Sequence, residues 1–174
     1  LNIAMTSNKK LVLVSQKDAS EEDPKDNQIY QYATISNLLQ LIKLPDGTMK
    51  VLVEGHKRCL INKIIEKDSY LTARVSEVVD LKLKESESIN LVRLIKAKFE
   101  DDISVTKRIP PEIVSTVDSL DDLSRLMDTI TGHLPIETSK KQEILESSDL
   151  KLRAEKVLTF IAVSYTHLRA HETS

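Results

Sequence analysis

The chain has 174 residues, enough for one domain or two small ones, and 40% of them are hydrophobic and 30% charged, as in ordinary globular proteins. Its formal net charge of −2 argues against a general nucleic-acid-binding protein, because phosphate binding depends on clustered Lys and Arg. No run of about 18 apolar residues and no basic-then-apolar opening is present, so we expect neither a membrane span nor a signal peptide. The single cysteine, Cys59, excludes an internal disulfide and a multi-cysteine metal site, and it fits a cytoplasmic protein.

The first half of the chain alternates β-rich runs with turn signals. Leu11–Ser15 is apolar and branched and predicts a buried strand, whereas the acidic segment Asp18–Gln28 predicts a loop. Leu38–Leu44 and Met49–Glu54 flank Pro45-Asp46-Gly47, in which Pro presets φ and Gly accepts a positive φ. These segments predict a β-hairpin.

A second hairpin follows directly. Arg58–Glu66 and Tyr70–Val79 are separated by Lys67-Asp68-Ser69, and apolar residues stand near alternate positions in the later strand. Residues 8–80 therefore predict a small antiparallel β-barrel or sandwich.

After residue 82 the apolar period becomes helical. Stripes at helical spacing predict four or five helices packed as an α-helical bundle, so the fold class is α+β. Ile109-Pro110-Pro111 breaks the chain, Ser119–Asp122 and Ser139–Gln142 have the form of helix N-terminal capping motifs, and Gly132 predicts a helix end. The stripe residues are Ile89, Val92, Ile95 and Phe99, then Leu123, Leu126, Met127 and Ile130, and finally Leu150, Ala154, Val157, Leu158 and Ile161.

The last segment differs from the rest. Ser164–Ser174 loses the apolar stripe and is rich in small and polar residues, so we expect a non-native tail, although a frayed helix end is the alternative. The chain begins with Leu1 and not Met, which predicts that the true start is missing. The expected organisation is a β-rich part over residues 1–82, a helical part over 83–163 and the tail over 164–174.

Four segments in order carry a family resemblance: LVLVSQKDAS (11–20), LPDGTMKVLVEG (44–55) followed by Arg58, KRIPPEIV (107–114) and DDLSRLMDTITGHLP (121–135). Together they resemble the N-terminal domain of bacterial Lon proteases, from residue 1 to about residue 163. The resemblance implies a PUA-like β-part before the helical bundle. The family's opening strand with its PLRD…FP motif is absent, so Leu1–Asn8 resembles the end of the helix that should follow that strand.

Catalytic and metal motifs are missing from the sequence. Three glycines allow neither GxxxxGK[ST] nor GxGxxG, and the four histidines have no zinc-ligand spacing. Ser139-Lys140 offers the residue types of a Ser–Lys dyad, but helix capping explains them better. We therefore expect no catalytic, cofactor-binding or metal-binding residues; the ATP and Mg²⁺ of Lon proteases belong to family regions that the chain lacks.

Three residues are candidate substrate contacts, each with an ordinary structural alternative. Tyr30 and Tyr32 border the acidic loop and either anchor it to the sheet or offer exposed apolar contacts to an unfolded chain. Arg58 follows Glu54-Gly55-His56-Lys57, which predicts a β-bulge with Arg58 paired on the surface or, alternatively, contacting a ligand. Cys59 is interpreted as a small buried residue and not as a reactive thiol.

The resemblance implies a function in an ATP-dependent serine protease of protein quality control. The domain would recognise unfolded or degron-bearing proteins and support assembly with other Lon subunits in a homo-hexamer, with no nucleic-acid or membrane partner. The alternatives are a stand-alone binding module without a protease and an RNA-binding barrel. An enzyme in its own right is the least supported interpretation, because it lacks a motif.

Overall fold

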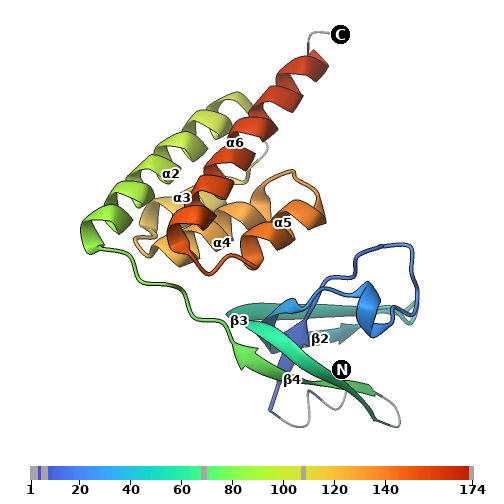
Figure 1. Ribbon diagram of the computed structural model, residues 1–174. Coiled ribbons are helices and arrows are strands. Elements are labelled where there is room, and N and C mark those ends of the chain that lie inside the picture. Colours follow the sequence, from blue (N-terminus) through green and yellow to red (C-terminus); the bar gives the residue numbers. More distant parts are fainter. Residues whose placement is uncertain (1–3, 5–7, 68–69, 107–108, 173–174) are drawn as a thin grey trace. The chain divides into compact units, whose positions relative to one another are not determined.

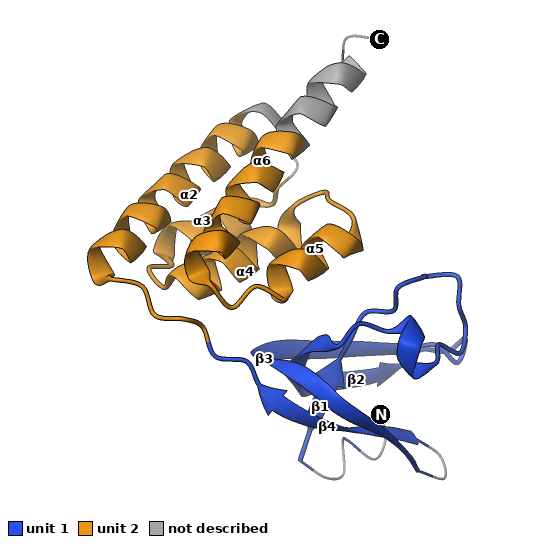
Figure 2. Ribbon diagram, in the orientation of Figure 1, with its two compact units in different colours: residues 1–79 blue, residues 80–174 orange. Residues whose placement is uncertain are grey.

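The structure, a computed structural model, describes the backbone of residues 4, 8–67, 70–106 and 109–172, and the side chains of this part except those of 105, 106 and 164–172. It divides into two compact units, Leu1–Val79 and Asp80–Ser174 (Figure 2). Most of the segment Leu1–Asn8, the second turn at Asp68 and Ser69, and the side chains of the predicted tail lie outside the described residues.

The first unit contains a four-stranded antiparallel sheet in the order β1-β2-β3-β4 (Figure 1). Its strands are β1 (Lys10–Leu13), β2 (Tyr32–Lys43), β3 (Met49–Lys67) and β4 (Tyr70–Glu77). A short 3-10 turn, η1 (Asp26–Gln28), lies in the loop between β1 and β2. The predicted antiparallel sheet is confirmed.

Strand β3 joins two segments that the sequence separates. Met49–Glu54 and Arg58–Glu66 were expected as strands of different hairpins, but β3 runs through both. Ile35 lies opposite Lys57 and Ser36 lies opposite Gly55, so one extra residue, His56, forms a β-bulge that leaves the strand continuous. A Cβ atom on Gly55 would lie 3.3 Å from the Thr34 Cγ2 atom, which explains why glycine suits this tightly packed position.

The turn between β2 and β3 has the predicted chemistry. Gly47 has a φ of 87°, in the left-handed region that favours glycine. The Asp46 carboxylate accepts a hydrogen bond from the Thr48 N–H at 2.9 Å, which closes the turn.

The second unit consists of α2 (Glu85–Thr106), α3 (Pro111–Ser119), α4 (Leu123–His133), α5 (Thr138–Leu145) and α6 (Leu150–Glu172) (Figure 1). The predicted bundle is confirmed, and α2 packs along α6. Among the described residues no helix combines the length and apolar character needed to span a bilayer. The buried core is formed by Val92, Ile95, Phe99, Val117, Leu123, Leu126, Met127, Ile130, Leu134, Ile144, Ala154, Val157 and Ile161. Ile89, predicted in the stripe of α2, is instead 45% exposed.

Both predicted capping motifs are wrong in detail. The Asp122 carboxylate caps α4 by accepting from the Arg125 N–H at 2.8 Å, whereas Ser119 ends α3 and its hydroxyl donates to the Thr116 carbonyl. Helix α5 begins at Thr138, one residue before Ser139, and its N-cap is Glu137, whose side chain makes no capping bond to the helix backbone. Ser139 is therefore inside the helix, where its hydroxyl cannot cap the first turn.

Candidate functional site

The sheet brings two of the three candidate substrate contacts close together. Tyr32 lies opposite Leu60, and Arg58 lies opposite Thr34. Since residues two apart on one strand share a face, Tyr32 and Arg58 are diagonal neighbours on the same face. Tyr30 precedes β2, and its N–H donates to the Ser15 carbonyl at 3.0 Å, so its backbone fastens the end of the acidic loop.

Arg58 is not the surface residue that its sequence context suggests. It is 8% exposed, and its carbonyl accepts a hydrogen bond from the Val78 N–H at 3.0 Å. Tyr30 and Tyr32 are both partly buried. The roles of Tyr30, Tyr32 and Arg58 as substrate contacts stay predictions.

Cys59 is a buried core residue, as its apolar context indicates. It is 0% exposed and lies opposite Ala33 on β2. Burial raises the pKa of the Cys59 thiol, although a hydrogen bond with the Ile35 backbone opposes the shift. Because the thiolate is the reactive form, this environment suppresses nucleophilic chemistry.

The helical unit arranges its Ser–Lys pair unfavourably for catalysis. The Lys140 ammonium lies 2.8 Å from a Glu143 carboxylate oxygen, and this hydrogen bond raises the pKa of Lys140. A lysine acting as a general base needs the opposite shift. Among the described residues, His, Cys, Asp and Glu form no cluster suited to a metal ion.

An apolar ladder runs along one face of the outer β2–β3 hairpin. Leu38 lies opposite Val53, Leu41 opposite Val51, and Met49 is the next residue on this face toward the turn. Leu38 is only 1% exposed, but Val51 is 37% and Met49 44% exposed. The apolar face therefore begins in the core and emerges into solvent near the turn.

The other side of this hairpin and its backbone edges are also open. Ile42 and Leu52 are 43% and 54% exposed, on the face opposite the ladder, and Leu39 in the bulge is 53% exposed. Within the described residues, the strand pairing of β1 reaches Asn37 on β2, with one further bond from the Leu38 N–H to the Lys9 carbonyl, and the pairing of β4 reaches Cys59 on β3, with one further bond from the Val78 N–H to the Arg58 carbonyl. The hairpin beyond these points is a two-stranded apolar ribbon, a kind of surface that marks binding sites.

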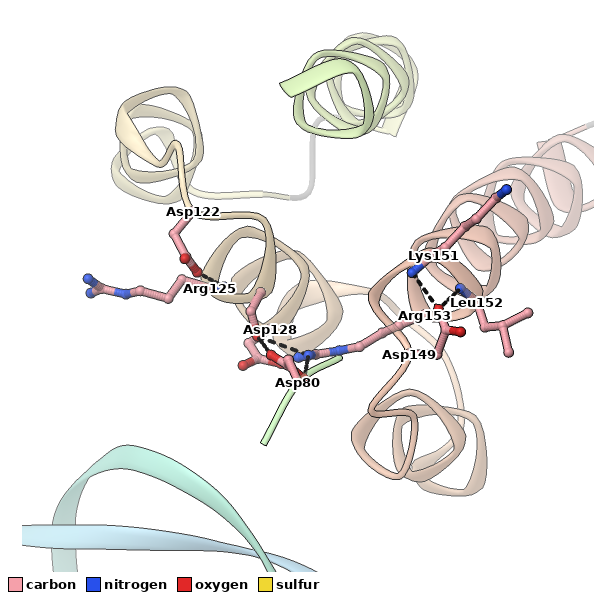
Figure 3. Close-up of polar contacts among 9 residues, drawn as sticks. Asp80, Asp122, Arg125, Asp128, Asp149, Lys151, Leu152 and Arg153 are labelled. Carbon is pink, nitrogen blue, oxygen red and sulfur yellow. Dashed lines mark hydrogen bonds and ion pairs between the residues drawn. The ribbon is translucent and has the colours of Figure 1, made fainter. Parts of the chain in front are cut away.

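A second cluster, in the helical unit, was not found from the sequence. The guanidinium of Arg153 in α6 is 0% exposed and reaches Asp80 and Asp128, as Figure 3 shows. It also contacts Ser124. Its Nη1 atom lies 2.9 Å from the Ser124 Oγ atom and 3.5 Å from an Asp80 oxygen, and its Nη2 atom binds Asp128. The Ser124 hydroxyl donates to the other Asp80 oxygen at 2.6 Å. We call these four residues the Arg153 cluster.

A family comparison identifies the domain. The model of the family described as "ATP-dependent protease La (LON) substrate-binding domain" matches residues 1–163. The chain is 38% identical to the Lon protease of Erwinia amylovora over 161 residues and 41% identical to that of Vibrio parahaemolyticus over 155 residues. These alignments cover 92% and 89% of this chain but 20% of each relative, so the chain spans a fifth of their length.

Solved structures show the same fold at lower identity. The N-terminal domain of a Mycobacterium avium complex Lon protease matches with a TM-score of 0.68 at 20% identity, covering 87% of this chain and 90% of that one. A Lon N-terminal domain protein from Xanthomonas campestris matches with a TM-score of 0.51 at 15% identity, covering 86% and 88%. The chain therefore belongs to the Lon substrate-binding domain family and matches the N-terminal, non-catalytic part of Lon proteases.

Proposed function

We propose that this chain is the substrate-recognition and assembly part of a cytoplasmic, ATP-dependent Lon-type serine protease that acts in protein quality control. Its ligands are apolar segments of unfolded or degron-bearing proteins, and its assembly partners are other subunits of a homo-hexamer. ATP and Mg²⁺ serve the remaining part of such a protease and bind elsewhere than on this chain.

The observation that carries the proposal is the apolar ladder of the β2–β3 hairpin. Val51 and Met49 expose apolar area on one face, and the hairpin edges leave backbone N–H and C=O groups outside the described strand pairings. An extended apolar segment can pair with such an edge and place alternate side chains on the ladder. A folded protein hides both its apolar side chains and its backbone groups, so it offers neither contact.

The expected affinity is modest. Apolar contacts of this size support a Kd no tighter than about micromolar, roughly −8 kcal/mol, after the cost of ordering an unfolded ligand. Binding should change little between low and moderate salt, because few charge pairs would be screened.

The test compares an unfolded protein with its native form. Isothermal titration calorimetry measures the binding of two ligands to the purified chain. The ligands are native lactalbumin and reduced, carboxymethylated lactalbumin, which is unfolded. A double variant, Met49→Gln with Val51→Thr, keeps side-chain size and strand propensity but removes apolar area. We expect it to bind the unfolded form about tenfold more weakly, corresponding to about 1.4 kcal/mol of lost apolar burial.

Leu94→Gln is the matched control. Leu94 in α2 is 46% exposed, similar to Met49, but lies in the other unit. Its variant should bind like the unmodified chain. Equal affinity for native and unfolded lactalbumin contradicts the proposal, and tight, salt-sensitive binding of RNA would favour the RNA-binding alternative instead.

A further inference from the structure

The polypeptide is anchored almost continuously where it passes from the sheet unit into the helical unit. On the sheet side, the Val78 N–H donates to the Arg58 carbonyl at 3.0 Å. On the helical side, the Asp80 carboxylate is held in the Arg153 cluster, and the Leu81 N–H donates to the Ser148 carbonyl at 2.9 Å. Val79, which is 73% exposed, stands alone between these two anchored stretches.

We infer that Ser124 and Arg153 together latch Asp80 onto the helical unit, the Ser124 hydroxyl at 2.6 Å and the Arg153 guanidinium at 3.5 Å, and thereby shorten the free connection between the two units to about one residue, Val79. If the latch opens, the next side chain that fixes the chain to the bundle is Leu83, which packs against the buried core. Once the backbone bond from the Leu81 N–H to the Ser148 carbonyl also opens, the free connection lengthens to residues 79–82.

The latch depends on charge in a buried setting. The Arg153 guanidinium is fully buried, and its Nε atom has no hydrogen-bond partner among the described residues. A buried cation with an unsatisfied donor relies strongly on the acceptors that remain. Those acceptors are Asp80, at 23% side-chain exposure, and Asp128, at 49%, together with the Ser124 hydroxyl.

The members of the cluster come from three separate segments, as Figure 3 shows for the labelled residues: Asp80 from the connection, Asp128 from α4 and Arg153 from α6. Ser124 stands in the first turn of α4. The same guanidinium therefore contacts α4 and the connection from its place in α6. Loss of the Asp80 carboxylate releases the connection, whereas Asp128 and Ser124 of α4 still bind Arg153 of α6.

Limited trypsin digestion tests the latch, because Lys82 is exposed and lies within the segment that the latch holds. The variant Asp80→Ala should accelerate cleavage of the Lys82–Leu83 bond roughly tenfold or more, the scale of a lost charge-assisted hydrogen bond. Mass spectrometry measures the cleavage rate, and amide hydrogen exchange of α4 and α6 reports the bundle. Exchange of the Leu81 N–H should rise with the cleavage, whereas exchange in the two helices should not.

The matched control is Asp118→Ala, which removes an exposed carboxylate of the same unit. Its cleavage at Lys82 should equal that of the unmodified chain. If Asp80→Ala does not fold, Ser124→Ala replaces it, because the Ser124 hydroxyl makes the 2.6 Å bond to Asp80. The inference is overturned if cleavage at Lys82 is unchanged, or if it rises only in step with exchange throughout the helices.

Discussion

The sheet unit should be the weaker of the two units, and Leu38→Ala is the substitution that reveals it. Among the described residues of this unit, Leu38 is the large apolar side chain that is almost fully buried, at 1% exposed, beside the small Ala33 and Cys59. Truncating a buried Leu costs about 2–5 kcal/mol. A unit spanning Leu1–Val79 has a total stability of roughly 4–12 kcal/mol. The variant therefore removes a large share of it.

Two optical probes separate the units. The chain has no Trp, and Tyr30, Tyr32 and Tyr70 all lie in the sheet unit, so tyrosine fluorescence reports mainly on the sheet. Circular dichroism at 222 nm reports on α2 to α6, all of which lie in the helical unit. In urea, Leu38→Ala should lower the fluorescence midpoint by about 1 M or more and leave the circular dichroism midpoint in place.

The converse substitution is Leu126→Ala, in the core of the helical unit, where Leu126 is 0% exposed. It should lower the circular dichroism midpoint and spare the fluorescence midpoint. Equal shifts of both probes in either variant would refute the reasoning, because the two units would then unfold as one cooperative structure.

Three smaller predictions concern the turn and the thiol. Gly47→Ala should destabilise the sheet unit by about 1–2 kcal/mol in urea melts, because a φ of 87° strains a residue with a Cβ atom. No neighbour lies within 4 Å of the added Cβ, so a steric clash cannot be the cause. Gly47→Asn should cost less, and equal costs would contradict backbone strain as the cause. Hydrogen bonds from Thr48, through its side chain first and its backbone second, lower the pKa of Asp46 from 3.8. The stabilisation by the ionised Asp46 carboxylate is therefore present above pH 3.8 and is lost as the pH falls through the lowered pKa. NMR titration of Asp46 should show the lowered pKa, and Thr48→Val should raise it. Iodoacetamide at pH 8 should alkylate Cys59 at least about a hundredfold more slowly in the native chain than in urea, and equal rates would contradict its burial.

Local chemistry made the hairpins predictable. Pro45-Asp46-Gly47 specifies the turn whatever the rest of the chain does, because Gly47 is free to adopt a positive φ. The same local view separated Met49–Glu54 from Arg58–Glu66, since Gly55 and His56 look like an interruption. Continuity of β3 depends on its partner strand, which accommodates one extra residue as a bulge, and a single strand carries no such information.

The helical period identified nearly the whole bundle core, but it could not locate the caps. Ser119 and Asp122 both have cap-forming side chains, and the choice between them depends on where α3 ends. The apolar ladder escaped notice for a different reason. Val51 and Met49 stand at the alternate positions that any half-buried strand shows. Only the strand pairing reveals that β1 and β4 end before the outer hairpin, so that no described strand pairs with it.

The burial of two arginines could not be predicted from the sequence pattern. Arg58 was expected on the surface, where charged side chains usually lie, yet it is 8% exposed, and Arg153, which no motif of the sequence singled out, is 0% exposed. Burial of Arg153 depends on partners far away in sequence, since Asp128, Ser124 and Asp80 stand 25, 29 and 73 residues from it, and no local period encodes these pairings. The two arginines also contact the two ends of the same connection. The Arg58 carbonyl accepts a hydrogen bond from the Val78 N–H, and the Arg153 guanidinium contacts the Asp80 carboxylate. Because burying a cation costs free energy that an apolar side chain would not, stability alone does not explain Arg153. Arg153 holds Asp80, and with it the start of the connection between the two units, which an apolar side chain at this position could not do.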